Sequence, residues 1–148
     1  DNKFLLSKNI VSLYNNEIEF KTTDSFEFDQ KPIKSKICHY ENNERVITLT
    51  ISNKLFIDNN LIACDVTSFE TYKRFLLVTQ NSNSPYSTLH ILDCTNINNL
   101  KELKPNFDAK LISLRTIERG SVIVGVVNNT VTLLAFFKFL LKNLLLNI

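Results

Sequence analysis

The sequence of 148 residues predicts an all-β protein. Short runs of apolar or alternating residues follow one another, and turn residues stand between them. No sustained helical period separates these runs, which argues against a fold that alternates strands with helices. Short strands at such frequent spacing are typical of two architectures, the β-sandwich and the β-propeller.

Each of these runs is a predicted strand. In chain order they are residues 4–7, 10–14, 17–22, 25–28, 33–39, 45–51, 54–57, 61–63, 66–70, 75–79, 88–93, 111–118, 121–127 and 130–136. Residues 17–21 alternate between charged and apolar side chains, which predicts one face in the core and one in water. Residues 96–110 are polar and contain Pro105, so we expect a long loop between sheets there.

Asparagine takes the place of glycine in the predicted turns. The chain has only 2 glycines. Asparagine tolerates the left-handed backbone conformation better than other non-glycine residues, and its side chain can bond to nearby backbone. Five asparagine pairs stand between predicted strands, at residues 15–16, 42–43, 59–60, 98–99 and 128–129. We interpret these pairs as turns.

Residues 114–136 predict a β-meander. Residues 115–118 alternate as in a half-buried strand, and Arg119-Gly120-Ser121 is a tight polar corner in which Gly120 can take a positive φ. Residues 122–127 are almost wholly apolar, as in a strand that is buried on both faces. After a turn at Asn128-Asn129, residues 131–136 supply a third strand.

Two stretches carry a resemblance to a known family. Residues 117–127, Ile-Glu-Arg-Gly-Ser-Val-Ile-Val-Gly-Val-Val, resemble the Val-Glu-Arg-Gly-Ser-Arg-Ile-Val-like segment near the end of the β-propeller region in the largest subunit of the Elongator complex. Residues 55–69, with Val-Thr-Ser-Phe at their end, and Phe75-Leu-Leu-Val-Thr79 are similar to an upstream pattern of that family. Together the matches span most of residues 46–136.

The resemblance implies a partial β-propeller with WD40-like blades built as antiparallel meanders. We therefore expect residues 1–136 to form the last blades of such a propeller. Because one blade takes about 40–45 residues, the chain has room for about three, and we expect it to be a fragment. The absence of methionine agrees with this expectation.

Residues 137–148 form an atypical apolar tail. The apolar run is shorter than the roughly 20 residues that span a bilayer, and it contains Lys138, Lys142 and Asn143. As a helix it would be amphipathic. The Elongator family carries a Pro-Arg-Gly-Asn-Leu-Glu-like motif at about this place, which the chain lacks. Our hypothesis is that this tail is a non-native ending.

Composition and motifs point away from catalysis. The net charge of +2 comes with no sustained basic block, which argues against a nucleic-acid patch in this segment. Cys38, Cys64 and Cys94 are widely spaced and read as reduced thiols, two or three of them buried. We predict no catalytic residue, no cofactor site and no metal site, because no ligand spacing or phosphate-binding loop is present.

A few residues have side chains that could take part in catalysis or binding. Cys94 and His90 could form a nucleophile pair, but hydrogen bonding along one strand is geometrically poor. We expect His39 and His90 to be packed or at the surface. The carboxylates near strand ends are expected to be solvated; they are Glu44, Asp58, Asp65 and Glu70. Six phenylalanines are expected in the core rather than stacked on bases; they are Phe4, Phe26, Phe28, Phe56, Phe69 and Phe75.

The resemblance also implies a function. It predicts a non-catalytic scaffold subunit of the Elongator complex, in which another, radical-SAM type subunit modifies wobble uridines in tRNA. The implied partners are other Elongator subunits, with tRNA reached only through the assembled complex, and a homodimer formed through C-terminal repeats outside this sequence. No membrane contact is expected. The implied location is the cytoplasm, with the nucleus as a second one.

Two alternatives remain open at this point. One is a stand-alone β-sandwich binding module with a membrane-associating C-terminal helix formed by residues 137–148. The other is a small hydrolase that uses Cys94 or a pair of acidic residues.

Overall fold

The chain is described from a computed structural model, and the described residues are 3–81, 87–103, 110–117, 121–128 and 130–136. Their regular elements are strands in three antiparallel sheets, so the predicted all-β class is confirmed. The first strands are β1 (Phe4–Tyr14), β2 (Glu17–Phe28), β3 (Pro32–Tyr40), β4 (Asn43–Thr50), β5 (Leu55–Ile57) and β6 (Asn60–Ala63). The others are β7 (Val66–Tyr72), β8 (Phe75–Gln80), β9 (Ser87–Asp93), β10 (Lys101–Leu103), β11 (Lys110–Ile117), β12 (Ser121–Asn128) and β13 (Thr130–Phe136).

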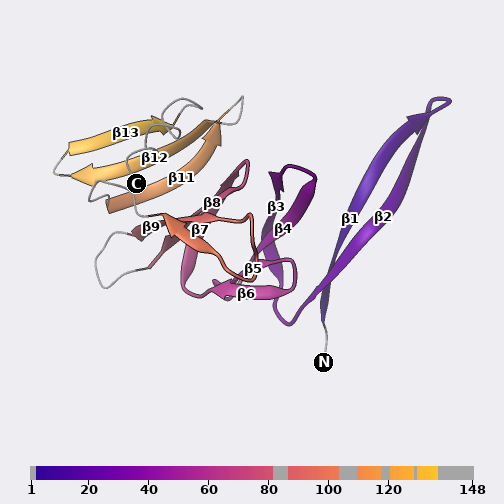
Figure 1. The fold of residues 1–148 in the computed structure, drawn as a ribbon, viewed down its shortest axis with the longest axis horizontal. Helices are drawn as coiled ribbons and strands as arrows, with labels where there is room; N and C mark the ends of the chain where they lie inside the picture. The colour runs from indigo at the N-terminus through magenta and orange to yellow at the C-terminus, as the bar shows by residue number, and fades with distance from the viewer. Residues whose placement is uncertain (1–2, 82–86, 104–109, 118–120, 129, 137–148) are drawn as a thin grey trace.

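β1 and β2 form a long hairpin that extends away from the rest of the molecule (Figure 1). Asn15 and Asn16 form its turn with φ values of 49° and 64°. Two positive φ values are what a two-residue type I′ hairpin requires, which confirms the turn predicted at this asparagine pair. The sequence predicted two strands on each side of the turn. The structure has one on each side, interrupted by a register shift between Lys8 and Asn9.

β3 to β6 form a four-stranded sheet in which spatial order equals chain order. Its two-residue turns are Glu41-Asn42 and Asp58-Asn59, one position earlier than the predicted asparagine pairs. The first residue of each turn has a positive φ, 51° at Glu41 and 53° at Asp58. The turn conformation therefore falls on the acidic residue that precedes the asparagine.

β7 to β10 form a second meander in chain order, which β11 to β13 extend to seven strands. β10 pairs with Ile91–Asp93 of β9, although a loop was predicted over residues 96–110. That prediction was wrong for β10, a strand of three residues that is too short to show alternation. The β11–β12–β13 meander is confirmed by its pairing. The predicted corner at Gly120, Asn129 of the predicted turn and the tail 137–148 lie outside the described residues.

The core lies on both faces of the β3–β6 sheet. Residues 46–50 of β4 are all buried, although they point alternately to opposite faces. One face packs against the β7–β9 sheet; this larger cluster contains Ile47, Leu49, Leu55, Ile57, Val66, Phe69, Leu76 and Val78. The other face carries a smaller cluster of Phe26, Phe28 and Val46, with Leu6 and Phe56 packed against it. Of the six phenylalanines expected in the core, four are buried, Phe56 is half-buried, and Phe4 is exposed.

Phe28 attaches the hairpin to the β3–β6 sheet. Its ring is 3% exposed and packs edge-on against Phe56, with 5.1 Å between ring centroids. We predict that Phe28→Ala lowers the free energy of unfolding by about 3 kcal/mol, because a large buried ring leaves a cavity. Urea unfolding measures the loss.

The matched control is Phe20→Ala on the same hairpin. Phe20 is 72% exposed, so its removal should change the free energy of unfolding of residues 1–148 by less than about 0.5 kcal/mol. Equal losses for the two variants would contradict the role given to Phe28.

Candidate functional site: the seam between β3 and β7

A buried carboxylate joins the two meanders. Glu70 on β7 is 5% exposed and forms ion pairs with Lys34 and Lys36 of β3. The Lys34 Nζ lies 2.9 Å from Glu70 Oε1, and the Lys36 Nζ contacts Oε2. Glu70 was expected to be solvated, and this expectation was wrong because β7 lies against β3 rather than at an open strand end.

Strand geometry explains why two lysines reach one carboxylate. Residues two apart on a strand point to the same face, so Lys34 and Lys36 both face β7. Lys34 also donates to the Phe69 carbonyl oxygen at 2.5 Å and lies over the Phe69 ring, 4.7 Å from its centroid. The only indication of this cluster in the sequence is a pair of lysines two positions apart, Lys34 and Lys36. The cluster was not predicted from it.

Two of the three thiols face each other across the same seam. Cys38 of β3 and Cys94, which follows β9, are buried in the same core cluster, while Cys64 is exposed. The Cys38 thiol also donates to the Lys73 carbonyl oxygen at 2.7 Å. The hydrogen bond with Cys38, with burial adding to it, raises the pKa of Cys94 well above its usual range. Cys94 therefore stays protonated at neutral pH, which disfavours it as a nucleophile.

The two histidines take part in local contacts. His90 Nδ1 lies 2.7 Å from Glu102 Oε1, and its Nε2 lies 3.3 Å from Thr88 Oγ1. His39 is exposed, with Nδ1 3.4 Å from Glu44 Oε1. These contacts place both histidines in the packed or surface roles that were expected.

The remaining carboxylates serve local structure. Asp58 accepts the Val46 backbone N–H at 2.9 Å and pairs with Arg45 Nη1 at 3.1 Å, which ties the β5–β6 turn to β4. Glu44 binds Lys8 of the hairpin and was rightly expected to be at the surface, and so was Asp65. In the part of the chain that the structure describes, no group of three or more His, Cys, Asp or Glu residues is placed to hold a metal ion. Within the same part, no helix is long and apolar enough to span a membrane.

Arg74 closes one end of the seam. Its guanidinium carbon lies 5.6 Å from the Tyr40 ring centroid and 4.9 Å from that of Phe75, and its Nε lies 3.2 Å from Asp93. A cavity of about 430 Å³ opens beside these residues, also lined by His39 and Lys73. Asp93 offsets the arginine charge by proximity alone, since the buried Nε makes no hydrogen bond with the described residues, and the guanidinium lies over two aromatic rings.

We predict that Glu70→Gln lowers the free energy of unfolding by about 2 kcal/mol, because it leaves two neighbouring lysines of β3 without their counter-charge in a half-buried seam. Urea unfolding checks this value. Glu27→Gln is the control, since it removes an exposed ion pair in which the Lys3 Nζ lies 3.3 Å from the Glu27 Oε2. Exposed pairs contribute about 0–1 kcal/mol. A loss no larger for Glu70 than for Glu27 would contradict a structural role for the cluster.

A second prediction concerns Glu44, which anchors the hairpin. Its hydrogen bond to Lys8 holds the pKa of the Glu44 carboxyl below 4.5. A lowered pKa in the folded state means that the pair stabilises the fold above pH 4.5, and that this stabilisation is lost as pH falls through the lowered pKa. In a carbon-13 NMR titration, Lys8→Met should raise the Glu44 midpoint toward 4.5, while Lys3→Met leaves it unchanged. No movement with Lys8→Met would exclude this cause.

Comparisons with known proteins agree with this architecture. A family model described as the ELP1 N-terminal second beta-propeller matches residues 5–124. A putative elongator complex protein 1 from Xenopus laevis is 32% identical over 106 residues, which is 68% of this chain and 8% of the relative. The chain thus spans less than a tenth of the length of that relative. No solved structure matches significantly. The two four-stranded meanders and the family match agree, and the chain belongs to the ELP1 second β-propeller family.

Proposed function

We propose that the chain is part of a non-catalytic scaffold in the Elongator complex, which supports modification of wobble uridines in tRNA. The observation that carries the proposal is the family match over residues 5–124. The contacts of the potentially reactive side chains support it as well. Glu70 is used in ion pairs, and the thiols of Cys38 and Cys94 are paired in the core.

The proposed partners are other Elongator subunits, and tRNA is reached through the assembled complex. A homodimer would form through repeats outside residues 1–148. The proposed location is the cytoplasm, with the nucleus as a second one. Rigid blades suit this role, because propellers present loops and strand edges to partners on a fixed frame.

The stand-alone sandwich with a membrane helix is not favoured by a specific observation. The four-stranded sheet β3–β6 and the meander β7–β10 within the seven-stranded sheet both follow chain order, as propeller blades do, and the tail on which the membrane contact depends lies outside the described residues. The burial of Cys94 in the core supports the scaffold over the thiol version of the hydrolase alternative.

The test uses the natural polypeptide that contains these residues, tagged in its own cells. We expect Elongator subunits to co-purify with it. Val78→Asp places a charge on a buried position of β8, so it should reduce both co-purification and wobble-uridine modification, the latter measured by mass spectrometry of bulk tRNA. Leu61→Asp, at an exposed position of β6, is the matched control and should leave both unchanged.

His90→Ala separates scaffold from catalyst. A scaffold should keep normal tRNA modification in this variant. Loss of modification from a folded, fully assembled His90→Ala complex would contradict the non-catalytic role. Failure of Elongator subunits to co-purify with the unaltered protein would contradict the scaffold itself.

A further inference from the structure

A cavity opens between two hairpin turns that belong to neighbouring meanders. One turn is Glu41-Asn42, between β3 and β4, and the other is Lys73-Arg74, between β7 and β8. Figure 1 shows the two turns at the same end of their meanders. Tyr40 and Phe75 also line the cavity, whose volume of about 430 Å³ lies within the roughly 300–1,000 Å³ of ordinary ligand pockets. The cavity is therefore large enough to receive a side chain of another molecule.

The Arg74 guanidinium lines this cavity with hydrogen-bonding capacity that the described residues leave unused. Its Nε lies 3.2 Å from Asp93 but makes no hydrogen bond with it. The Oδ1 atom of Asp93 accepts two hydrogen bonds from Thr95, one from the backbone N–H at 3.0 Å and one from the hydroxyl at 2.5 Å. Arg74 lies over the rings of Tyr40 and Phe75, which limits its orientation. A guanidinium held in this way matches the two oxygens of a carboxylate or a phosphate.

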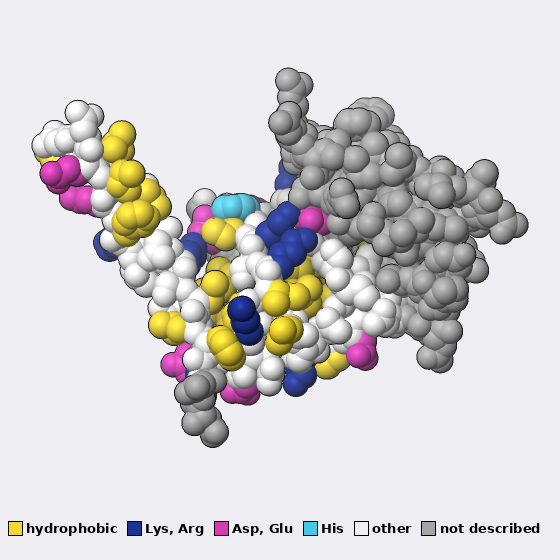
Figure 2. All heavy atoms as spheres, turned by 180° about the vertical axis from the view of Figure 1, so that it is seen from behind, with side chains coloured by type: hydrophobic (Ala, Val, Ile, Leu, Met, Phe, Trp, Pro, Cys, Tyr) yellow, Lys and Arg dark blue, Asp and Glu magenta, His cyan; other side chains and the backbone are white. Residues whose placement is uncertain are grey.

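Lys73 adds a second positive charge on the same turn. Its ammonium lies 5.9 Å from the Tyr72 ring centroid and forms no ion pair with a carboxylate of the described residues. Negative charge is present too, because Asp93 lies beside Arg74 and Glu41 lines the cavity. On the face that Figure 2 shows, basic side chains likewise lie among acidic and hydrophobic ones rather than in one basic patch. This balance favours a ligand with a single negative charge over a phosphate dianion or a polyanion.

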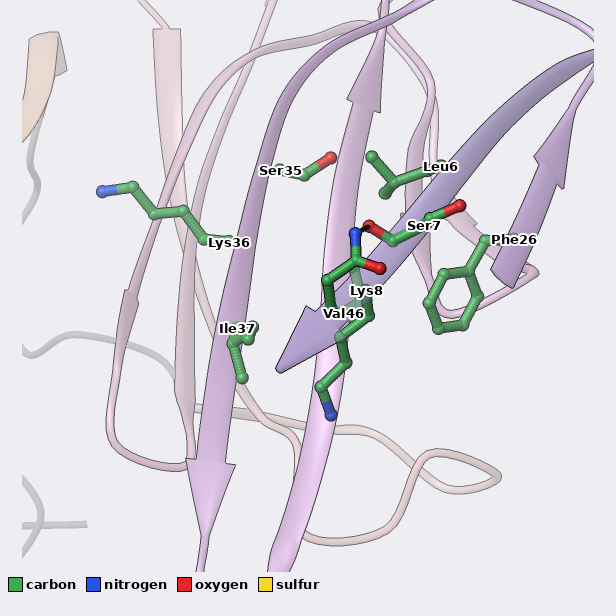
Figure 3. Close-up of a pocket in the computed structure, with 9 residues that line it drawn as sticks. Leu6, Ser7, Lys8, Phe26, Ser35, Lys36, Ile37 and Val46 are labelled. Carbon is green, nitrogen blue, oxygen red and sulfur yellow. Dashed lines mark hydrogen bonds between the residues drawn. The ribbon is translucent and has the colours of Figure 1, made fainter. Parts of the chain in front are cut away.

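Another cavity, of about 190 Å³ between β1 and β3, lacks these features. Figure 3 shows apolar side chains around it, while Lys36 extends away from them. Lys36 is paired with Glu70, and Lys8, the other lysine of the lining, is paired with Glu44. The charged side chains of this cavity therefore have partners within the chain, whereas the cavity beside Arg74 has positive charges with unused donors.

We propose that the cavity between the two turns receives an aspartate or glutamate side chain from another subunit of the complex, and that Arg74 and Lys73 bind its carboxylate. Arg74 donates two parallel hydrogen bonds to the carboxylate, and Lys73 adds its charge. The rings of Tyr40 and Phe75 form the wall on which the aliphatic part of that side chain lies. The inference rests on the proposed function, because it names the chemistry by which a partner in that complex is recognised.

The exposure of the site selects a protein as the source of the carboxylate. The Arg74 side chain is 40% exposed, so a small free acid would leave the charge pair in water, where such pairs contribute about 0–1 kcal/mol. A protein surface that covers both turns excludes this water and strengthens the charge pair. Each turn has two residues, so neither is long enough to fold over the cavity itself. A folded partner supplies the cover that the turns do not.

Carbodiimide cross-linking in the assembled complex tests this proposal. The water-soluble carbodiimide EDC activates a carboxylate, and a lysine amine in contact with that carboxylate then displaces the urea and forms an amide bond. The complex is purified through the tagged natural polypeptide, treated with EDC and digested for mass spectrometry. We expect Lys73 to be joined to an aspartate or glutamate of another subunit. Arg74→Gln should lower the yield of this link by about fivefold or more per co-purified subunit, because the bidentate hydrogen bonds are lost.

The matched control is Lys54, a second exposed lysine, which lies between β4 and β5. We expect it to give no link of comparable yield. Equal yields at Lys54 and Lys73 would mean that coupling follows exposure alone, and would contradict a binding site beside Arg74.

Each other outcome overturns the proposal. A link from Lys73 to Glu41, or to another part of the same polypeptide, would assign the cavity to this chain. No link at Lys73 in a complex whose subunits co-purify would remove the site and leave the scaffold in place, and an unchanged yield in Arg74→Gln would exclude the arginine as the anchor. Failure of the subunits to co-purify would contradict the proposed function, and the inference with it. If Arg74→Gln does not fold, the unaltered complex still decides, because the link at Lys73 requires no variant.

Discussion

The structure depends on one constraint, that the β3–β6 sheet must be covered on both faces. Residues 46–50 of β4 are buried without interruption, so neither face can remain in water. Ile47 and Leu49 pack toward the β7–β9 sheet, and Val46 packs toward the hairpin. The position of the hairpin on one side and of the next meander on the other follows from this pattern. Stacked sheets that share their faces in this way are what a propeller repeats around its axis.

Polar groups then fix how the stacked sheets align. An apolar seam would tolerate sliding of β3 along β7, whereas a buried carboxylate must keep its partners. Glu70 meets both lysines only when Lys34 and Lys36 stand opposite it, so the cluster selects one register. The Cys38–Cys94 contact lies in the same seam and has the same requirement. Residue types that carry chemistry in other proteins are used here for alignment.

The sequence predicted the strands best where turns were marked by asparagine. Asn15-Asn16 has the two positive φ values of a hairpin turn, and the pairs near residues 42 and 59 missed their turns by one residue. β10 was missed because three residues carry no periodicity. The burial of Glu70 could not be predicted, since it depends on contact between strands 34 to 36 residues apart in the chain. The family resemblance was confirmed because its motifs lie inside the matched residues 5–124 and just beyond them. The boundary at residue 136 and the nature of the tail stay predictions.

The register shift in the hairpin changes which face of the ribbon carries the apolar residues of β2. β1 keeps its alternation through the shift, and Thr23 of β2 is the residue that the register skips; its hydroxyl donates to the Lys8 carbonyl oxygen at 3.3 Å. Leu6 therefore points to the face that packs on Val46, whereas Val11 points to the opposite face. The pairs Val11–Phe20 and Leu13–Ile18 place four exposed apolar side chains on that opposite face. Ile10 and Tyr14 lie on the same side of β1 as Leu6 and are exposed as well, so beyond the shift both faces of the ribbon carry apolar side chains.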